Sequence, residues 1–351
     1  MSSSATINTI GSPLSDDHAE LVVSKLMLGR VVPFLGAGVN LCDRPLGFTW
    51  TSSEQSFAPN GSELAAELAE KFKYIKKGSL CTAPSDQCLR PRPELDLARI
   101  SQFGDFKEGS GGLYEALREL FTRKYPPTSF HDFLASLPAV EPERGRPENR
   151  NLLIVTTNYD DMMERALEEF CPLDVVFFDP EAKPPRFWHR QPNGTTRKID
   201  NPKDHEYLFF EEHPVVLKIH GTIDRSEDSH EGFVITEDDY IEYLAGEPLE
   251  NLLPDEVLAK LRCNHLLFLG YSLRDWNLRV FLRRLKRNPR LAFKAWAVMP
   301  YVDSLEKEFW MRQDVEIIPV MLKPYLEALN NEIGTKGIKL RDKKGTGGGG
   351  G

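Results

Sequence analysis

Short apolar runs alternate with longer amphipathic stretches along most of the chain. The runs are rich in β-branched residues and lack the strict two-residue alternation of a half-exposed strand, so both of their faces are expected to be covered. Strands of this kind, separated by helical patterns, are typical of βα units on a parallel sheet. The predicted strands span residues 31–35, 152–156, 175–178, 215–219, 265–269, 293–299 and 315–320. The sequence therefore predicts an α/β fold with a Rossmann-like, doubly wound parallel sheet.

Helical patterns surround these strands, and one group of them forms an insertion. A helix is predicted over residues 16–28, ahead of the first strand. More than a hundred residues then separate the first two strands, far more than a simple crossover needs. Helical patterns at 63–72, 113–121 and 130–137 predict a helical insertion over about 60–137 that packs as a lid over the sheet's edge. Residues 179–213 lack clear periodicity, which favours a surface loop or a short hairpin.

The two ends of the chain do not have the composition of a folded core. Residues 1–14 lack the apolar and basic segments of a secretory signal and are expected to be flexible. Residues 336–351 pass from charged residues into a glycine repeat, which favours a flexible tail or linker. No stretch approaches the roughly 20 apolar residues of a membrane span, so no membrane partner is predicted. One catalytic domain is expected over residues 15–335.

Charge and cysteine content narrow the possible partners. The formal net charge of the 351 residues is −9, so nucleic acid is not predicted as a direct partner of this domain. The arginine-rich helical pattern at 278–287 is interpreted as a solvated face or a subunit interface, with nucleic-acid binding as the lesser alternative. The 5 cysteines include no C-x-x-C pair, so neither zinc nor another metal site is predicted. This cysteine usage suits a reducing cytoplasm.

A glycine turn follows the first strand, as Gly36-Ala37-Gly38 before Val39 and Asn40. Such a turn lets backbone N–H groups approach a diphosphate closely. An ordinary strand-to-helix turn that uses glycine for positive φ explains the same residues equally well. The motif alone leaves both interpretations open.

Polar side chains follow the second strand, where Thr157, Asn158 and Asp160 lie in sequence. At the carboxyl edge of an open parallel sheet, such groups can bind a ribose hydroxyl, a carboxamide or a water. Capping of the helix predicted over 162–170 is the competing explanation. Capping is preferred for Asp160 and less so for Asn158, because one helix needs only one cap.

A histidine and a second glycine turn follow two further strands. His220 comes directly after the strand at 215–219, where a neutral imidazole can accept a proton from water or a ribose hydroxyl. A purely structural hydrogen bond is the alternative role. Gly270, Tyr271 and Ser272 follow the strand at 265–269 and suit a contact with phosphate or ribose.

Four strand endings in this order resemble the sirtuin superfamily, and more closely its prokaryotic sirtuin-like (SIR2-like domain) branch than the protein deacetylases. They read Gly-Ala-Gly, Thr-Thr-Asn-Tyr-Asp, Lys-Ile-His-Gly and Leu-Gly-Tyr-Ser-Leu. The resemblance extends from residue 31 to about 329 and implies a sirtuin-like, DHS-like NAD-binding fold. It implies that Asn158 contacts the ribose and orders the attacking water, and that His220 is the general base. The NAD⁺-binding residues that it implies or accommodates are Gly36, Ala37, Gly38, Asn40, Thr157, Asp160, Gly270, Tyr271 and Ser272.

Two departures from the sirtuin deacetylases shape the functional expectation. The deacetylases hold a structural zinc with two C-x-x-C pairs, which this chain lacks. Asn40 stands where a serine commonly follows the glycine motif, and the family's Asp-Phe-Arg segment has only Asp43-Arg44-Pro45 nearby. The first departure weakens the case for protein deacetylase activity. The second changes residues that would form the nicotinamide pocket.

The prokaryotic branch hydrolyses NAD⁺ in antiphage defence, often as oligomers and as modules of larger systems. The resemblance therefore implies an NAD⁺ hydrolase that releases nicotinamide and ADP-ribose. It further implies a homo-oligomer under the control of a partner or a fused defence module. Two alternatives remain open, a module that senses NAD⁺ or ADP-ribose without turnover and an NAD⁺-dependent protein deacylase.

Overall fold

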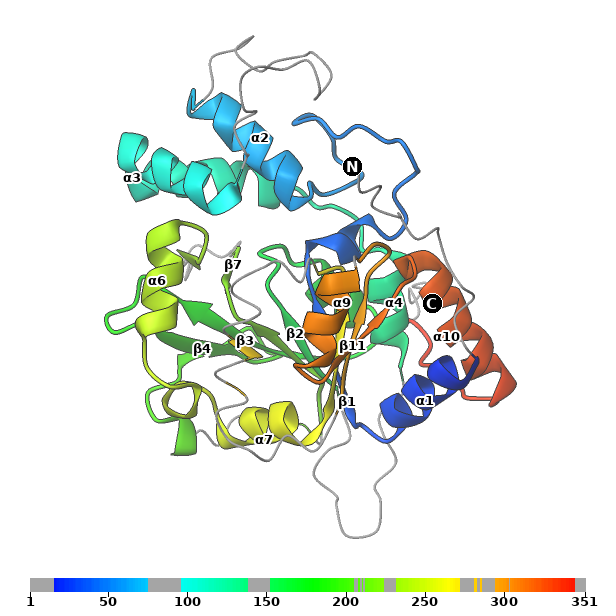
Figure 1. The fold of residues 1–351 in the computed structure, drawn as a ribbon. Helices are drawn as coiled ribbons and strands as arrows, with labels where there is room; N and C mark the ends of the chain where they lie inside the picture. Colours follow the sequence, from blue (N-terminus) through cyan, green and yellow to red (C-terminus); the bar gives the residue numbers. More distant parts are fainter. Residues whose placement is uncertain are drawn as a thin grey trace, which may run out of the picture.

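The computed structural model describes residues 16–74, 96–137, 152–204, 208, 210, 212–223, 232–271, 281–282, 285, 294–302 and 304–344. Within this part of the chain, one large sheet is flanked by helices on both faces (Figure 1). Its strands are β1 (Val31–Leu35), β2 (Leu153–Thr156), β3 (Asp174–Asp179), β4 (Arg186–Arg190), β5 (Thr196–Lys198), β6 (Val215–Lys218), β9 (His265–Leu269), β10 (Ala295–Val298) and β11 (Val315–Ile318). A separate small ladder pairs β7 (Gly221–Thr222) with β8 (Gly232–Phe233).

The strand order confirms the predicted doubly wound sheet. It runs β11-β10-β9-β1-β2-β6-β3-β4-β5, and every pair from β11 to β3 is parallel. The chain leaves β1 toward β2 on one side and later returns to β9 on the other. The carboxyl ends of β1 and β9 therefore form the point where the winding reverses, which is where open α/β sheets bind ligands.

The region at 179–213 contains a hairpin, which was one of the two alternatives that the sequence left open. Strands β4 and β5 pair antiparallel with β3 and with each other, and they extend the sheet at one edge. In β4 the buried residues alternate with half-buried ones, because Phe187 and His189 face inward. The imidazole of His189 lies 2.8 Å from the Asp174 carboxylate, which ties β4 to β3.

Alternate residues of β1 enter two cores, one on each face of the sheet. Val32 and Phe34 belong to one core, whereas Val31 and Leu35 belong to the other. The helices that supply these cores are α1 (Asp16–Met27), α4 (Ser129–Ser136), α5 (Met162–Glu168), α6 (Glu237–Ala245), α7 (Asp255–Cys263), α9 (Ser304–Met311) and α10 (Leu322–Thr335). Burial on both faces explains why the strands lack a two-residue alternation.

A smaller helical layer lies above the carboxyl edge of the sheet. It consists of α2 (Gly61–Lys71) and α3 (Leu97–Phe121), which share a third core with residues such as Tyr159 and Phe233 (Figure 1). Helix α3 bends at Gly109, whose φ of 77° is not helical. The predicted insertion extends to residue 137, but its last helix, α4, packs in the main core beside α5. The helical layer above the sheet is therefore α2 and α3 alone among the described elements.

Residues 336–351 were predicted to be a flexible tail, but the described part, 336–344, lies against the body of the protein. After α10, the backbone N–H of Arg341 donates to the Ser136 carbonyl at 2.7 Å, and Lys343 Nζ lies 2.6 Å from Glu169 Oε2. Residues 1–14 and the glycine repeat at 345–351 lie outside the described residues, as does most of the arginine-rich stretch at 278–287. No helix in the described ranges has the length and apolar character of a membrane span.

Candidate functional site

A cavity of about 420 Å³ opens at the carboxyl edge of the sheet, under the N-termini of α2 and α3. It is bordered by the segments that follow β1, β2, β6 and β9. The predicted site residues that line it are Gly36, Ala37, Gly38, Asn40, Thr157, Asn158, Asp160, His220, Gly270 and Tyr271. Ser272 lies outside the described residues. The structure thus brings the four predicted strand endings together in one place.

The glycines of the first motif are needed for a close backbone crossing rather than for positive φ. Gly36 has a φ of −101°, and its N–H donates to the Leu269 carbonyl at 2.9 Å. The N–H of Gly38 donates to the Gly270 carbonyl at 2.9 Å. A Cβ at either Gly36 or Gly38 would lie 2.7 Å from that carbonyl oxygen. The segments after β1 and β9 therefore meet backbone to backbone, and two N–H groups of the motif are already used.

We expect Gly270→Ala to destabilise the fold more than Gly47→Ala does. Both glycines have positive φ, 68° and 76°, so both alanines carry a conformational strain of about 1–2 kcal/mol. A Cβ at Gly270 would lie 2.2 Å from the Val39 nitrogen, whereas one at Gly47 meets nothing within 4 Å. The overlap adds roughly 1–3 kcal/mol at Gly270. Urea unfolding measures both losses, and equal losses would show that the crossing tolerates a side chain.

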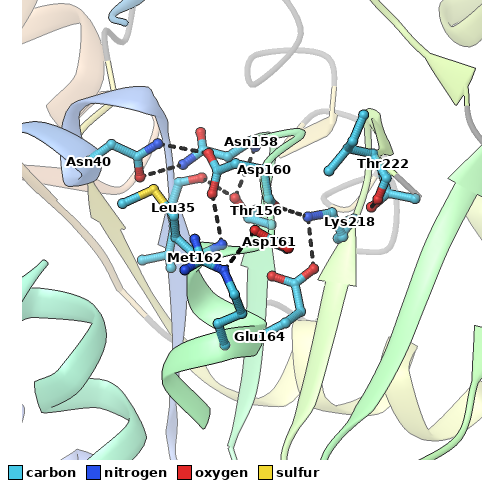
Figure 2. Close-up of polar contacts among 12 residues, drawn as sticks. Leu35, Asn40, Thr156, Asn158, Asp160, Asp161, Met162, Glu164, Lys218 and Thr222 are labelled. Carbon is cyan, nitrogen blue, oxygen red and sulfur yellow. Dashed lines mark hydrogen bonds and ion pairs between the residues drawn. The ribbon is translucent and has the colours of Figure 1, made fainter. Parts of the chain in front are cut away.

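Asn40, Asn158 and Asp160 form a hydrogen-bonded group on one wall of the cavity (Figure 2). Asn40 Nδ2 donates to Asp160 Oδ2 at 2.7 Å. Asn158 Nδ2 donates to the Gly36 carbonyl at 3.2 Å and, more weakly, to Asn40 Oδ1 at 3.4 Å. The other oxygen of Asp160 accepts the Met162 N–H at 3.0 Å, at the start of α5, but the N-cap position is Asp161 rather than the predicted Asp160.

This group fixes which end of the Asn158 amide can meet a ligand. A carbonyl oxygen such as that of Gly36 can only accept a hydrogen bond, so the Asn158 atom that faces it must be the NH₂ group. The amide oxygen of Asn158 is therefore the atom available to accept a hydrogen from water or from a hydroxyl. Asn40 contributes by holding both Asn158 and Asp160, a role that the sequence pattern did not reveal.

A buried ion pair supports the Asp160 turn from below (Figure 2). Lys218 Nζ lies 2.9 Å from Glu164 Oε1 and also donates to the Asp160 carbonyl. The two side chains are 0% and 4% exposed. The pair joins the end of β6 to α5 and to the segment that carries Asn158.

His220 lines the cavity in a neutral state. Its residue is 3% exposed, and its Nε2 atom has no hydrogen-bond partner within the structure as described. The rings of Tyr240 and Tyr243 lie edge-on to it, with centroids 6.0 and 5.9 Å away. Burial lowers the pKa of His220 to about 3, so the ring holds no positive charge at neutral pH. A neutral Nε2 in a cavity is positioned to bind a ligand atom or a proton.

Buried histidines make the fold sensitive to acid. Burial lowers the pKa of His131 to about 4, as it lowers that of His220 to about 3, while an unfolded histidine titrates near 6.5. The unfolded chain therefore binds more protons below about pH 6.5, and stability is lost as pH falls through this window. The slope approaches about 1.4 kcal/mol per pH unit for each histidine.

We expect His220→Gln to make this dependence shallower. Glutamine keeps a polar side chain in the cavity but does not titrate. Urea unfolding of wild type and variant at pH 7.5, 6.0 and 5.0 gives both slopes. An unchanged slope in the variant would mean that His220 titrates in the folded protein as it does in the unfolded chain.

Helices α2 and α3, which form the lid over the cavity, contribute residues that were not predicted from the sequence. Asn60, Gly61 and Ser62 line the cavity from the N-terminus of α2, and Asp96 does so from the N-terminus of α3. The available signal was the capping-box pattern, in which Asn60 and Glu63 bond reciprocally at 2.8 and 2.9 Å. Such a pattern indicates where a helix begins but not which surface it packs against.

Comparison with known families agrees with this geometry. Residues 152–318 match the model of the SIR2-like domain, whereas a search of curated proteins found no match to the chain. The matched segment runs from β2 to β11 and includes Asn158 and His220. The glycine motif on β1 precedes it but lies in the same cavity. This chain thus carries a sirtuin-like domain, a SIR2-like domain at 152–318, which implies an NAD-related function and the binding of NAD⁺.

Proposed function

We propose that the protein hydrolyses NAD⁺ to nicotinamide and ADP-ribose. The observation that carries this proposal is that Asn158 and His220 line a single cavity within a SIR2-like fold, and that His220 Nε2 has no hydrogen-bond partner among the described residues. One side chain offers an amide oxygen that can orient a water. The other offers a neutral nitrogen that can accept a proton.

The reaction breaks the bond between the ribose C1′ and the nicotinamide nitrogen. The electron pair of that bond leaves with nicotinamide, and positive charge builds on the ribose. Asn158 accepts one hydrogen of a water, which directs an oxygen lone pair toward C1′. The new C1′–oxygen bond makes the other water hydrogen acidic, and His220 Nε2 accepts it before releasing it to solvent. A weak base suffices for this step, because the attacked carbon is cationic.

The test is NAD⁺ consumption by the purified protein, with chromatography of the products. Nicotinamide and ADP-ribose in equal amounts support hydrolysis. Acetyl-ADP-ribose formed only with an acetyl-lysine peptide would assign a deacylase instead. Calorimetric binding of NAD⁺ without any product, at every protein concentration tried, would assign a sensor.

We further propose that this activity depletes NAD⁺ in the cytoplasm as an abortive-infection response to phage. The support is the resemblance to the prokaryotic branch, together with the need to restrain an enzyme that is toxic to its own cell. We expect the NAD⁺ hydrolase activity to be controlled by assembly as a homo-oligomer and by a partner or fused module. Light scattering gives the assembly state, and a phage challenge of cells with wild type or Asn158→Ala tests the role.

A further inference from the structure

A second cavity, of about 520 Å³, lies between α6 and the segment that follows β3. Among the described residues, none that lines it also lines the cavity of Asn158 and His220, which we call the first cavity. Apolar side chains form much of its wall, including Phe178, Pro180 and Leu252. Its volume lies in the range of small-molecule sites, about 300–1,000 Å³. The second cavity therefore has room for a small organic molecule with an apolar body.

The two walls of the second cavity are held by hydrogen bonds of their own. Asp179 accepts the Glu181 N–H at 3.0 Å and the indole N–H of Trp188 at 3.0 Å, which fixes the turn after β3. On the opposite wall, Asp239 accepts the Thr236 N–H at 2.8 Å in the capping box that begins α6. The second cavity is thus formed before any ligand enters it.

The charged side chains of the second cavity are all acidic. None of its lining residues in the described ranges is lysine or arginine, whereas the carboxylates on its wall are those of Glu181, Asp239, Glu242 and Glu247. Neutral groups donate to two of them, the Tyr114 hydroxyl to Glu181 at 2.8 Å and the Asn251 amide to Glu247 at 2.8 Å. Because neutral donors leave the negative charge in place, a cation is the ligand that complements this wall.

One buried side chain connects the second cavity to His220. Tyr243 is 5% exposed and lines the second cavity. Its ring lies edge-on to the rings of Phe178 and His220, with centroids 5.3 and 5.9 Å away. The same helix, α6, carries Tyr240, which lines the first cavity. A charge in the second cavity would therefore act on His220 through buried aromatic rings, where charges interact more strongly than in water.

We propose that the second cavity binds a small organic cation, an ammonium or guanidinium group on an apolar body, and that this ligand inhibits the reaction in the first cavity. The binding follows from the shape and charge of the second cavity alone. The inhibition rests on the proposed hydrolysis, in which His220 accepts a proton and becomes positively charged. A cation beside Tyr243 disfavours that second positive charge and makes His220 a weaker base. Occupancy of the second cavity therefore lowers the kcat for NAD⁺.

Two probes of the same shape test the binding. Tryptamine is an indole with an ammonium group, and tryptophol is the same indole with a hydroxyl in its place. Titration calorimetry without NAD⁺ measures the affinity of each. The double variant Glu181→Gln/Glu242→Gln removes two charges from the wall, and the glutamine at 181 can still accept the Tyr114 hydroxyl. The matched control, Glu256→Gln/Glu327→Gln, changes the net charge equally at two exposed positions on α7 and α10.

We expect wild type to bind tryptamine about tenfold more tightly than tryptophol. The Glu181→Gln/Glu242→Gln protein should lose about threefold to tenfold of its tryptamine affinity, the effect of removing two partly exposed charge interactions. Its tryptophol affinity should not change, and the control should bind both probes like wild type. Failure of wild type to bind tryptamine, equal affinity for the two probes, or an equal loss in both double variants would overturn the site.

The inhibition has a separate readout. Saturating tryptamine should lower the kcat for NAD⁺ by about fivefold or more in wild type, the lower end of coupling between two sites. The Glu181→Gln/Glu242→Gln protein should need a correspondingly higher tryptamine concentration for the same effect. Binding of tryptamine with an unchanged kcat would keep the site and overturn the inhibition. A protein that never consumes NAD⁺ would overturn the proposed hydrolysis and the inhibition with it, whereas the titrations would still decide the site.

Discussion

Replacing Asn158 by alanine is expected to lower the kcat for NAD⁺ hydrolysis by about a hundredfold to a thousandfold. The amide oxygen would no longer orient the attacking water, and losses of this size follow removal of one preorganised hydrogen-bonding group. His220→Ala is expected to cost about a hundredfold to ten-thousandfold, the range for a general base. Because both side chains act on one water, the double variant should lose much less than the product of the single losses.

The interpretation depends on controls that preserve the fold. Asn158→Asp keeps the shape but places a carboxylate oxygen opposite the Gly36 carbonyl, where the NH₂ group now donates at 3.2 Å. It should therefore not restore activity. Asn330→Ala, on the exposed side of α10, should be as active as wild type. Full activity in both purified Asn158→Ala and His220→Ala, with unchanged melting temperatures, would remove these residues from the mechanism.

The sheet and the gathering of the site were predictable from the sequence. Strands β1 and β9 have the bounds predicted for them, because each is a continuous apolar run closed by a glycine. Carboxyl ends of adjacent parallel strands meet at one edge, so polar residues placed after β2 and β6 had to approach each other. Position along the chain was enough to place Asn158 and His220 in one cavity.

Other features depended on contacts between distant segments. The reason for Gly36 and Gly38 lies in Gly270, more than two hundred residues away, and no local pattern shows that close approach. The lid residues Asn60 and Asp96 reach the cavity because α2 and α3 pack with Tyr159 and the β7–β8 ladder, which is tertiary information. Strand β4 lies in the region at 179–213, where the sequence lacks clear periodicity and left a surface loop and a short hairpin open, and its alternating burial is seen only in the structure.

Lys218→Met is expected to lower the free energy of unfolding by about 3–5 kcal/mol. The change leaves the Glu164 carboxylate, 4% exposed, without the cation that lies 2.9 Å from its Oε1. Its Oε2 atom already has no hydrogen-bond partner among the described residues, so nothing nearby offsets the loss. Urea unfolding followed by circular dichroism measures the change, with the slope on denaturant checked for two-state behaviour.

The double variant Lys218→Met/Glu164→Leu separates a lost ion pair from an isolated buried charge. Removing both charges should recover most of the stability, because well-packed apolar residues often replace a buried pair without cost. As a control, Arg312→Met breaks an exposed ion pair between Arg312 and Glu308, which are 76% and 55% exposed. This change should lower the free energy of unfolding by at most about 1 kcal/mol. If the double variant is as unstable as Lys218→Met alone, the lysine acts mainly through its bond to the Asp160 carbonyl. In that case, the loss should also appear as reduced NAD⁺ turnover, since the same turn carries Asn158.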